Sequence, residues 1–328
     1  MKRIGRILFL GALLIAALLF LNNTTLLGPA MSGKPSLLAH RGLAQNFHRE
    51  GLTNETCTAE RIYPPVHDYL ENTIASMRAA FDAGADVVEF DVQPTTDGQF
   101  AVFHDWTVDC RTEGKGVTRE HTLAELKALD IGYGYTADGG KTFPFRGKGV
   151  GMMPSLDEVL AAFPDKRFLI NIKGNDPAEG ELLAKQLAKL APEQRQHLMA
   201  YGGALPIAAL HTGLPELKVL SKATLKRCAI AYIGVGWSGY VPQACRNTLL
   251  LIPNNYAPLV WGWPNRFLER MRSADTAVFV AGDYAEGDAG SSGIDDTAAL
   301  AELPAGYDGG ILTNRIDLIG PLARNAQR

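Results

Sequence analysis

Short apolar runs alternate with amphipathic segments along most of the chain, and this alternation is typical of an α/β protein. Apolar runs bounded by turn residues predict strands over 36–39, 86–92, 100–103, 167–173, 198–201, 217–220, 248–252, 277–281 and 310–313. Apolar residues at helical spacing predict helices over 71–83, 122–129, 156–162, 177–190 and 265–273. About eight strands alternating with helices over roughly 290 residues predict a TIM-type (β/α)8 barrel.

The first residues of the chain follow a different pattern. Lys2, Arg3 and Arg6 precede residues 7–21, which include no charged or polar side chain, and the next charge is Lys34. A basic flank before an apolar run is typical of an export signal or a membrane anchor, with its basic end in the cytoplasm. We therefore expect an exported protein, either anchored in the inner membrane and facing the periplasm or periplasmic after cleavage.

The chain divides accordingly into two parts. Residues 1–31 are expected to form the basic segment with the signal peptide or anchor, and residues 32–328 the barrel. Small residues suited to cleavage, Gly28 and Ala30, lie rather far from the apolar run, which favours a retained anchor. A long polar stretch at 43–70 is interpreted as an insertion on the active face of the barrel.

Composition and charge narrow the function classes. The chain has 46% apolar and 20% charged residues, which excludes a disordered or fibrous protein. Its formal net charge is −3, and −6 without the three basic residues at the N-terminus, so no basic surface for nucleic acid is indicated. No protein partner is implied either.

The four cysteines are candidates for disulfide bonds if the barrel is exported, because thiols tend to oxidise outside the cytoplasm. Four cysteines allow three pairings. Cys228 and Cys245 are close in sequence and flank a predicted loop at 232–240, whereas Cys57 and Cys110 lie in polar, loop-like stretches. We therefore favour the pairs Cys57–Cys110 and Cys228–Cys245, with four free thiols as the alternative.

Charged and polar residues gather where predicted strands run into loops. The four groups are His40-Arg41, Glu89-Phe90-Asp91, His104-Asp105 and Asn171-Ile172-Lys173. Glu89 and Asp91 are two residues apart on a strand, so their side chains point to the same side. Two carboxylates inside a barrel need a cation, and oxygen ligands suit Mg²⁺ or Ca²⁺.

A predicted turn at Asp97-Gly98 brings the second histidine to these carboxylates. The dipeptide is a strong two-residue turn signal, and a hairpin closed there places Asp91 opposite His104. A parallel barrel instead requires the chain to return before residue 100, so the local signal and the barrel conflict. Either arrangement leaves His104 beside the carboxylates.

Two histidines beside a metal suggest general acid–base catalysis on a phosphate ester. Arg41 and Lys173 are suited to hold the phosphoryl oxygens, Arg41 through a bidentate fork. One histidine would activate the attacking oxygen, from water or from a neighbouring hydroxyl of the substrate, and the other would protonate the leaving alcohol. The residues at the four strand ends carry this prediction jointly, since each is a weak signal by itself.

In their order along the chain, these motifs resemble the glycerophosphodiester phosphodiesterase family over about residues 36–320. The motifs are His40-Arg41-Gly42, Glu71-Asn72-Thr73, Glu89-Phe90-Asp91-Val92, Asp97-Gly98, His104-Asp105, Thr122-Leu123-Ala124-Glu125-Leu126, Pro154-Ser155-Leu156 and Lys173. The resemblance implies a TIM-type barrel that hydrolyses a small-molecule glycerophosphodiester to an alcohol and glycerol 3-phosphate.

The resemblance also implies roles for the matching residues. His40 and His104 correspond to the acid–base pair of the family. Glu89 and Asp91 correspond to ligands of one divalent cation, usually Ca²⁺ or Mg²⁺. Lys173 corresponds to a residue that supports the phosphate.

Three departures from the family pattern matter. Asn171 stands where a third metal ligand is usually Glu; an amide oxygen adds no charge, so metal affinity falls unless Glu71, which matches an acidic residue near the metal, compensates. The insertion at 43–70 is longer than usual and is expected to shape substrate choice. Near the C-terminus, Thr313-Asn314 replaces a frequent Thr-Asp.

Two other functions stay open. A phospholipase D-like enzyme would cleave lyso- or sphingo-phospholipids. The position of Cys110, shortly after the second histidine, resembles that of a cysteine in the venom sphingomyelinase branch. A glycerophosphodiester binder would keep the pocket and have lost catalysis through Asn171. Several aromatic residues would suit a lipid substrate, although we interpret them as packing at the barrel rim. They are Tyr232, Trp237, Tyr240, Trp261 and Trp263.

Overall fold

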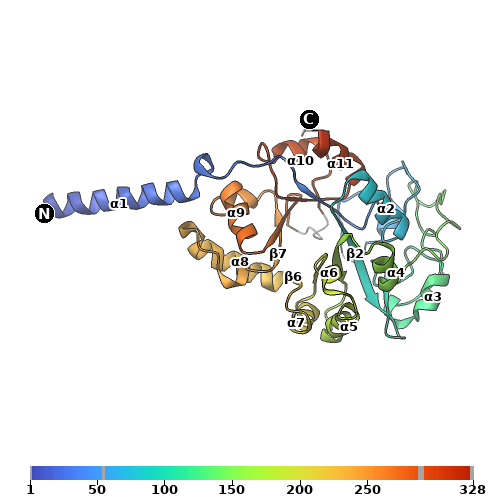
Figure 1. Cartoon of the computed structure of the whole chain (residues 1–328). Helices are drawn as coiled ribbons and strands as arrows, with labels where there is room; N and C mark the ends of the chain where they lie inside the picture. Colours follow the sequence, from blue (N-terminus) through green and yellow to red (C-terminus); the bar gives the residue numbers. More distant parts are fainter. Residues whose placement is uncertain (1, 54–55, 287–291, 326–328) are drawn as a thin grey trace.

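The protein is described by a computed structural model that covers residues 2–53, 56–286 and 292–325. Eight parallel strands form a barrel in the order β6-β5-β4-β2-β1-β9-β8-β7 (Figure 1). The predicted TIM-type barrel is confirmed, and a short extra strand, β3, pairs with β2. The strands are β1 (Ser36–Ala39), β2 (Val87–Pro94), β3 (Phe100–Val102), β4 (Arg167–Ile172), β5 (Leu198–Gly202), β6 (Lys218–Ser221), β7 (Leu249–Pro253), β8 (Ala277–Ala281) and β9 (Gly310–Thr313).

The barrel is nearly closed between β6 and β7, the two ends of the hydrogen-bonded path. The hydroxyl of Thr248, just before β7, donates to the carbonyl oxygen of Val219 on β6 at 2.7 Å. A side chain therefore bridges the seam in place of a regular backbone ladder.

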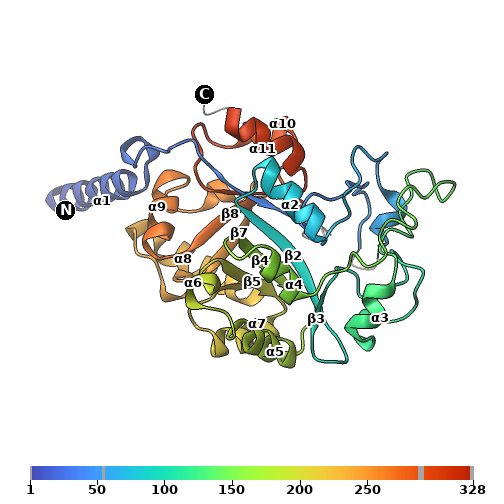
Figure 2. The same ribbon diagram turned by 45° about the vertical axis from the view of Figure 1, so that its right-hand side comes forward.

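Helices cover the outside of the barrel (Figure 2). They are α2 (Ile74–Ala83), α3 (Leu123–Ala128), α4 (Leu156–Ala162), α5 (Pro177–Leu187), α6 (Pro192–Arg195), α7 (Ala204–Gly213), α8 (Lys222–Val235), α9 (Asn265–Ser273), α10 (Thr297–Glu302) and α11 (Ile316–Asn325), whereas α1 (Lys2–Asn23) does not cover the barrel. Alternation along β2 shows how the layers form. Phe90 points outward and meets Phe168 edge to face at 5.3 Å, whereas Val87 joins the apolar interior of the barrel. Glu89 and Asp91 follow the inward set.

The hairpin between β2 and β3 resolves the conflict seen in the sequence. β2 is long enough to pair with β1 and β4 inside the barrel and with β3 beyond it. The predicted pairing of Asp91 with His104 is wrong by one residue, because the amide of Phe103 donates to the carbonyl oxygen of Asp91. Thr95 pairs with Gln99 across a three-residue loop in which Gly98 takes φ 71°.

Two predicted boundaries need correction. The helix expected at 71–83 begins at Ile74, because Asn72 has a φ of 60° and Thr73 forms a capping box with Ser76. The glycine- and aromatic-rich loop expected at 232–240 is wrong in its first part, since α8 continues through Val235. Helix α8 begins with a capping box, and only the end of the stretch 232–240 is irregular.

Both expected disulfides are present. Cys57 and Cys110 are joined with an S–S distance of 2.04 Å, and Cys228 and Cys245 with one of 1.99 Å. The first disulfide ties the insertion at 43–70 to the loop after β3, and the second ties α8 to the segment before β7.

The N-terminal helix α1 projects away from the barrel (Figures 1 and 2). Its stretch Arg3–Asn23 has a mean hydropathy of 2.5 and is not buried in the structure, so it is long and apolar enough to cross a membrane. A signal sequence near an N-terminus has the same properties.

Candidate active site

The strand registers bring the polar groups of the sequence into adjacent rows. Ala39 pairs with Val88 on one side and with Thr313 on the other, so His40 follows in line with Glu89 and Asn314. Asp91 pairs with Asn171, which in turn pairs with Tyr201 on β5. These rows lie at the carboxyl ends of parallel strands, where TIM-type barrels build their sites.

His40 is held by an amide. Its Nδ1 donates to Asn314 Oδ1 at 2.7 Å, and its Nε2 lies 3.8 Å from Glu89 Oε2. Asn314 is held in turn by Asp295, which accepts from its backbone N–H at 2.6 Å and from its side-chain Nδ2 at 2.8 Å. Burial, together with the positive charge of Arg41, lowers the pKa of His40 to about 3, so the ring is neutral.

His104 is held by a carboxylate. Its Nδ1 donates to Asp105 Oδ1 at 2.7 Å, and Asp105 Oδ2 accepts from Arg111 Nε at 2.8 Å. Burial opposes the charged form of Asp105, but Arg111 and the histidine hold the pKa of this carboxyl well below its usual range. In both histidines Nδ1 is engaged, which orients the ring and leaves Nε2 for chemistry.

Glu89 and Asp91 are fully buried on β2. Glu89 accepts hydrogen bonds from Tyr201 Oη at 2.7 Å and from the backbone N–H of Arg41 at 3.0 Å. Burial and the neighbouring charge of Asp91 raise the pKa of Glu89 to about 8. Burial would also raise the pKa of Asp91. The positive charge of Lys173 opposes this effect together with His104 and Arg41, so the pKa of Asp91 lies well below its usual range.

Two arginines and Glu71 form a buried chain behind the carboxylates. Arg41, at a φ of 59°, donates from Nη1 to Glu71 Oε1 at 3.1 Å and approaches Asp91 Oδ2 with Nε at 3.3 Å. The other oxygen of Glu71 lies 3.2 Å from Arg111 Nη1. Glu71 therefore bridges Arg41 and Arg111, and Arg41 faces carboxylates in this structure.

The donor set fits a divalent cation in part. Among the described residues no group of three or more His, Cys, Asp or Glu side chains is arranged to hold a metal. Asn171 turns its Nδ2 toward Asp91 Oδ1 at 2.8 Å, so its amide would have to rotate to offer oxygen to a cation. Four carboxylates nevertheless face three permanent cations, and the raised pKa of Glu89 means that this group holds a proton, which a divalent cation would displace. The carboxylates are those of Glu71, Glu89, Asp91 and Asp105, and the cations are Arg41, Arg111 and Lys173.

A cavity of about 710 Å³ opens above these groups. His40, His104, Arg41 and Lys173 line it, as do several residues of the insertion at 43–70. The cavity is therefore the place where both histidines and both phosphate-binding candidates meet. The insertion residues that line it are Phe47, Leu52, Thr53, Thr56, Cys57 and Thr58.

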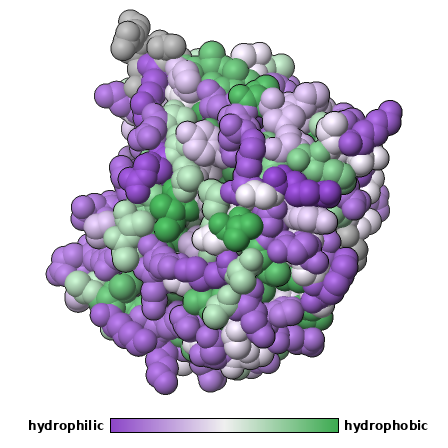
Figure 3. All heavy atoms as spheres, turned by 90° about the vertical axis from the view of Figure 1, so that its right-hand side faces the viewer, coloured by the Kyte–Doolittle hydropathy of each residue, from purple (hydrophilic) through white to green (hydrophobic). Residues whose placement is uncertain are grey.

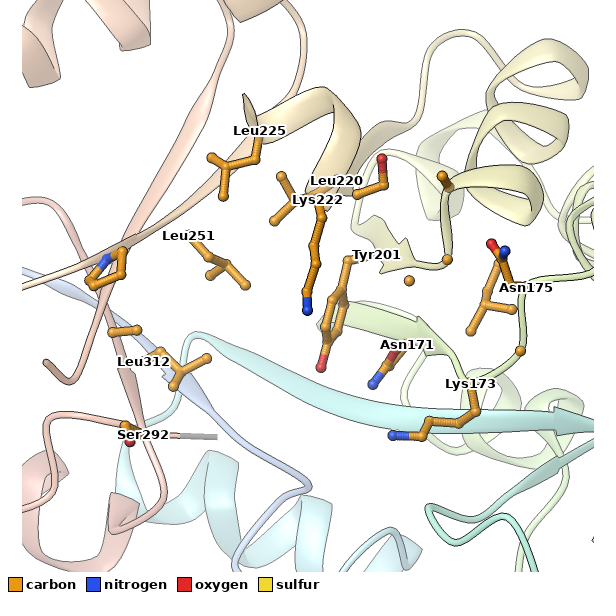
Figure 4. Close-up of a pocket in the computed structure, with 18 of the residues that line it drawn as sticks. Asn171, Lys173, Asn175, Tyr201, Leu220, Lys222, Leu225, Leu251, Ser292 and Leu312 are labelled. Carbon is orange, nitrogen blue, oxygen red and sulfur yellow. The ribbon is translucent and has the colours of Figure 1, made fainter. Parts of the chain in front are cut away.

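A second cavity of about 910 Å³ continues from the first one. Figure 4 shows Asn171, Lys173 and Tyr201 on one side of it and leucines on the other. The two cavities share Asn171, Lys173, Tyr201 and Trp106, so a bound molecule can reach from one to the other. The leucines are Leu220, Leu225, Leu251 and Leu312.

Several contact residues escaped the sequence reasoning. Asn72 donates from Nδ2 to Asp91 Oδ2 at 3.0 Å and accepts from the backbone N–H of Asp91 at 3.1 Å. Tyr201 and Asp295 were missed because each comes from a distant segment, and Arg111 because only the fold turns its loop toward Asp105. The Glu71-Asn72-Thr73 motif was the one available signal for Asn72.

The fold and the polar cluster at its strand ends define a TIM-type barrel with a charged site at the carboxyl ends of its strands. A model of the glycerophosphoryl diester phosphodiesterase family matches residues 40–200. A glycerophosphodiester phosphodiesterase of Caldanaerobacter subterraneus is 45% identical over 103 residues, which cover 31% of this chain and 39% of that protein. One from Bacillus altitudinis is 28% identical over 184 residues, covering 54% and 71%. The chain belongs to the glycerophosphodiester phosphodiesterase family.

Solved structures agree with this fold. The glycerophosphoryl diester phosphodiesterase domain of a Mycobacterium tuberculosis protein superposes with a TM-score of 0.61 at 16% identity, covering 88% of this chain and 99% of that one. A phosphodiesterase of Oleispira antarctica, in complex with the product sn-glycerol-3-phosphate, gives a TM-score of 0.54 at 18% identity, with 89% and 97% covered. The matches to several curated relatives span less than half of those proteins' length.

Proposed function

We propose that this chain hydrolyses glycerophosphodiesters to an alcohol and glycerol 3-phosphate, with one divalent cation, Ca²⁺ or Mg²⁺. The observation that carries the proposal is the pair of oriented histidines, His40 and His104, lining one cavity with Arg41 and Lys173. Family membership and the product complex of the Oleispira antarctica protein support the substrate class.

Arg41 and Lys173 bind the phosphodiester in this proposal. Lys173 Nζ lies 3.6 Å from Asp91 Oδ1 and is partly exposed to the cavity. Arg41 is buried among carboxylates, so its positive charge acts at the phosphate from below the cavity floor. Glycerophosphodiesters carry a single negative charge, which these two cations complement.

The two histidines exchange protons with the reacting oxygens. One Nε2 accepts the proton of the attacking hydroxyl, from water or from the substrate, as its oxygen forms the new bond to phosphorus. Attack by the substrate hydroxyl gives a cyclic phosphate, which water then opens in a second step to glycerol 3-phosphate. The other, protonated, gives its proton to the alcohol oxygen as the old P–O bond breaks. Asp105 stabilises a proton on His104 through its negative charge, whereas Asn314 only orients His40.

Glu89 and Asp91 would hold the cation, with Asn171 and Glu71 as further candidate ligands. When bound, it would neutralise charge that develops on the phosphoryl oxygens. The two neighbouring carboxylates of Glu89 and Asp91 support this assignment, whereas Glu71 would have to leave its ion pairs with both arginines to bind a cation.

We propose further that the barrel lies outside the cytoplasm, held at the inner membrane by α1 or released after cleavage. The apolar, exposed α1 and the two disulfides support export. Contacts of residues 22–29 with the barrel favour retention of the helix, because cleavage beyond them would remove partners of Arg270 and Asn265.

A second candidate function is cleavage of lyso- or sphingo-phospholipids in the manner of a phospholipase D. The leucine-lined cavity beside the catalytic one favours it, because an apolar chain would be buried there. In that reaction the same two histidines act, and only the occupant of the second cavity differs.

Activity of the full chain against several substrates and metals tests the proposal. Glycerophosphocholine, lysophosphatidylcholine and sphingomyelin are each assayed with Ca²⁺, Mg²⁺ or excess chelator. Turnover of glycerophosphocholine that needs a divalent ion is expected. Preference for either lipid would favour the second candidate, and tight glycerophosphocholine binding without turnover would indicate a binder that has lost catalysis.

A further inference from the structure

An exposed apolar surface lies on the barrel beside the end of α1. It is formed by the outward face of α8, by the residues that directly follow α8, and by the loop at Trp261, whose indole N–H donates to the carbonyl oxygen of Ile233. We call it the α8 flank; it consists of Ile230 (62% exposed), Ile233 (61%), Trp237 (45%), Tyr240 (57%) and Trp261 (38%). The expectation that all these aromatics pack at the rim is wrong for the exposed ones, although Tyr232 and Trp263 do pack against Phe267.

The flank is rigidly connected to the point where α1 ends. The side-chain amides of Asn22 and Asn23 both donate to the carbonyl oxygen of Trp237, at 2.9 and 2.8 Å. Arg270 donates to the carbonyl oxygens of Asn22 and Gly236. The end of an apolar helix long enough to span a bilayer is therefore fixed to the flank itself.

The segment after α1 is fixed to the same side of the barrel. Asn265 at the start of α9 donates to the carbonyl oxygens of Thr25 and Pro29, at 3.0 and 3.1 Å. In Figures 1 and 2, α8 and α9 lie on the side from which α1 projects. A bilayer crossed by α1 would thus meet this side of the barrel first.

The chemistry of the flank suits the surface of a phospholipid bilayer. Trp237 and Trp261 have their indole N–H groups bonded to the carbonyl oxygens of Gly234 and Ile233, so their exposed ring edges are apolar. Tryptophan and tyrosine favour the interfacial layer of a membrane. The flank continues along α8 into exposed basic residues, which suit anionic headgroups. These are Lys226 and Arg227.

The opposite side of the barrel differs in character. In Figure 3, which shows the side turned away from α1, hydrophilic side chains spread over the surface and apolar ones are scattered between them. Scattered apolar residues are ordinary on a protein surface, whereas a contiguous aromatic and aliphatic group marks a contact.

We propose that the α8 flank rests on the outer surface of the phospholipid bilayer that α1 enters, and so fixes the orientation of the barrel relative to the membrane. The proposal depends on the retention of α1 proposed above and is independent of the reaction. Its occupant is lipid, not a second copy of the chain.

Quenching of tryptophan fluorescence by brominated lipids tests this contact. The full chain, shown by its intact mass to retain α1, is reconstituted into phosphatidylethanolamine–phosphatidylglycerol vesicles with or without bromine on the acyl chains. The W106F variant, which keeps both flank tryptophans, is expected to lose most of its flank emission in brominated vesicles. The W237F/W261F variant, which keeps Trp106 at the cavity and Trp263 packed against Phe267, is expected to show almost no loss.

A matched pair of charge substitutions sharpens the test. I230E/I233E is expected to weaken quenching, whereas Val150→Glu, at an exposed site on the loop that pairs with Asp130, is expected to leave it unchanged. Near-ultraviolet circular dichroism checks that each variant is folded. Equal quenching in W106F and W237F/W261F, or cross-linked dimers through the flank with no quenching, would overturn the proposal. Hydrolysis by detergent-solubilised enzyme is expected to be the same in I230E/I233E and the unsubstituted chain, so a failed contact and a failed reaction are distinguishable.

Discussion

The two sides of the barrel carry different side chains at equivalent positions. The strands β9, β1, β2, β4 and β5 end in charged, amide and phenolic groups that contact one another, and we call this the polar side. The strands β6, β7 and β8 end beside leucines, the α8 flank lies on the outer face of the helix that follows β6, and we call this the apolar side. The same fold therefore separates the candidate catalytic groups, on the polar side, from the apolar surfaces, on the other.

The largest expected effect is the loss of a histidine on the polar side. Replacing His40 or His104 with Ala removes a proton-transfer group, and turnover of glycerophosphocholine is expected to fall by about 10²–10⁴-fold. Steady-state release of glycerol 3-phosphate measures it. His211→Ala, an exposed histidine on α7, is the matched control and should retain normal turnover. Normal rates in both active-site variants would remove the histidines from the reaction.

Removal of the cation comes next. Excess chelator is expected to silence the enzyme, because the phosphoryl oxygens would lose the positive charge that Glu89 and Asp91 are proposed to hold beside them, and added Ca²⁺ or Mg²⁺ should restore the rate. Glu89→Gln is expected to raise the metal concentration needed for half-maximal activity. Glu181→Gln, exposed on α5, serves as its control. Full activity in excess chelator would exclude a metal from the reaction.

The buried ion pairs of the polar side are expected to matter for stability as well. Arg111 lies between Asp105 and Glu71 and donates to Tyr135, so Arg111→Met removes the strongest ionic partner of Asp105 and one of the two arginines that pair with Glu71. The expected loss of unfolding free energy, measured by denaturant unfolding, is about 3–5 kcal/mol. The control is Lys127→Met, which removes an ion pair at the surface and should change stability by no more than about 1 kcal/mol. Equal losses would show that burial is unimportant here.

The smallest effect on catalysis is expected from the apolar side. Leu251→Asn places a polar group in the leucine-lined cavity and should leave glycerophosphocholine turnover nearly unchanged. If lysophosphatidylcholine is also a substrate, its kcat/KM should fall by roughly 10-fold, because an apolar chain loses its contact. Leu205→Asn, on α7 outside the cavity lining, is the control. A loss shared equally by both substrates would mean that the cavity supports the site instead of selecting the alcohol.

The sequence predicted the local features of the polar side well. The alternation around Glu89-Phe90-Asp91 placed both carboxylates inside the barrel, and Thr122 caps its helix as the pattern indicates. These features depend on neighbours within a few residues, where backbone geometry is decisive. The orientation of Asn171, by contrast, depends on a hydrogen bond to Asp91 on the neighbouring strand.

Features that rest on long-range contacts could not be predicted. The ladder register of β3 was one residue off, because a three-residue loop and a two-residue turn share the same Asp97-Gly98 signal. Arg111 reads as an ordinary charged loop residue until the fold buries it beside Asp105. The exposure of the α8 flank could not be predicted either. An apolar residue in a helix is expected to be buried, and only the fold shows that no other element covers it.

Product identification tests the central claim most directly. Glycerophosphocholine is incubated with the full chain and a divalent cation, and phosphorus NMR follows which P–O bond is cleaved. The proposed reaction predicts glycerol 3-phosphate and choline, with both products formed about 10²–10⁴-fold more slowly by H40A or H104A. Phosphocholine as the product, or no turnover with either Ca²⁺ or Mg²⁺, would contradict it.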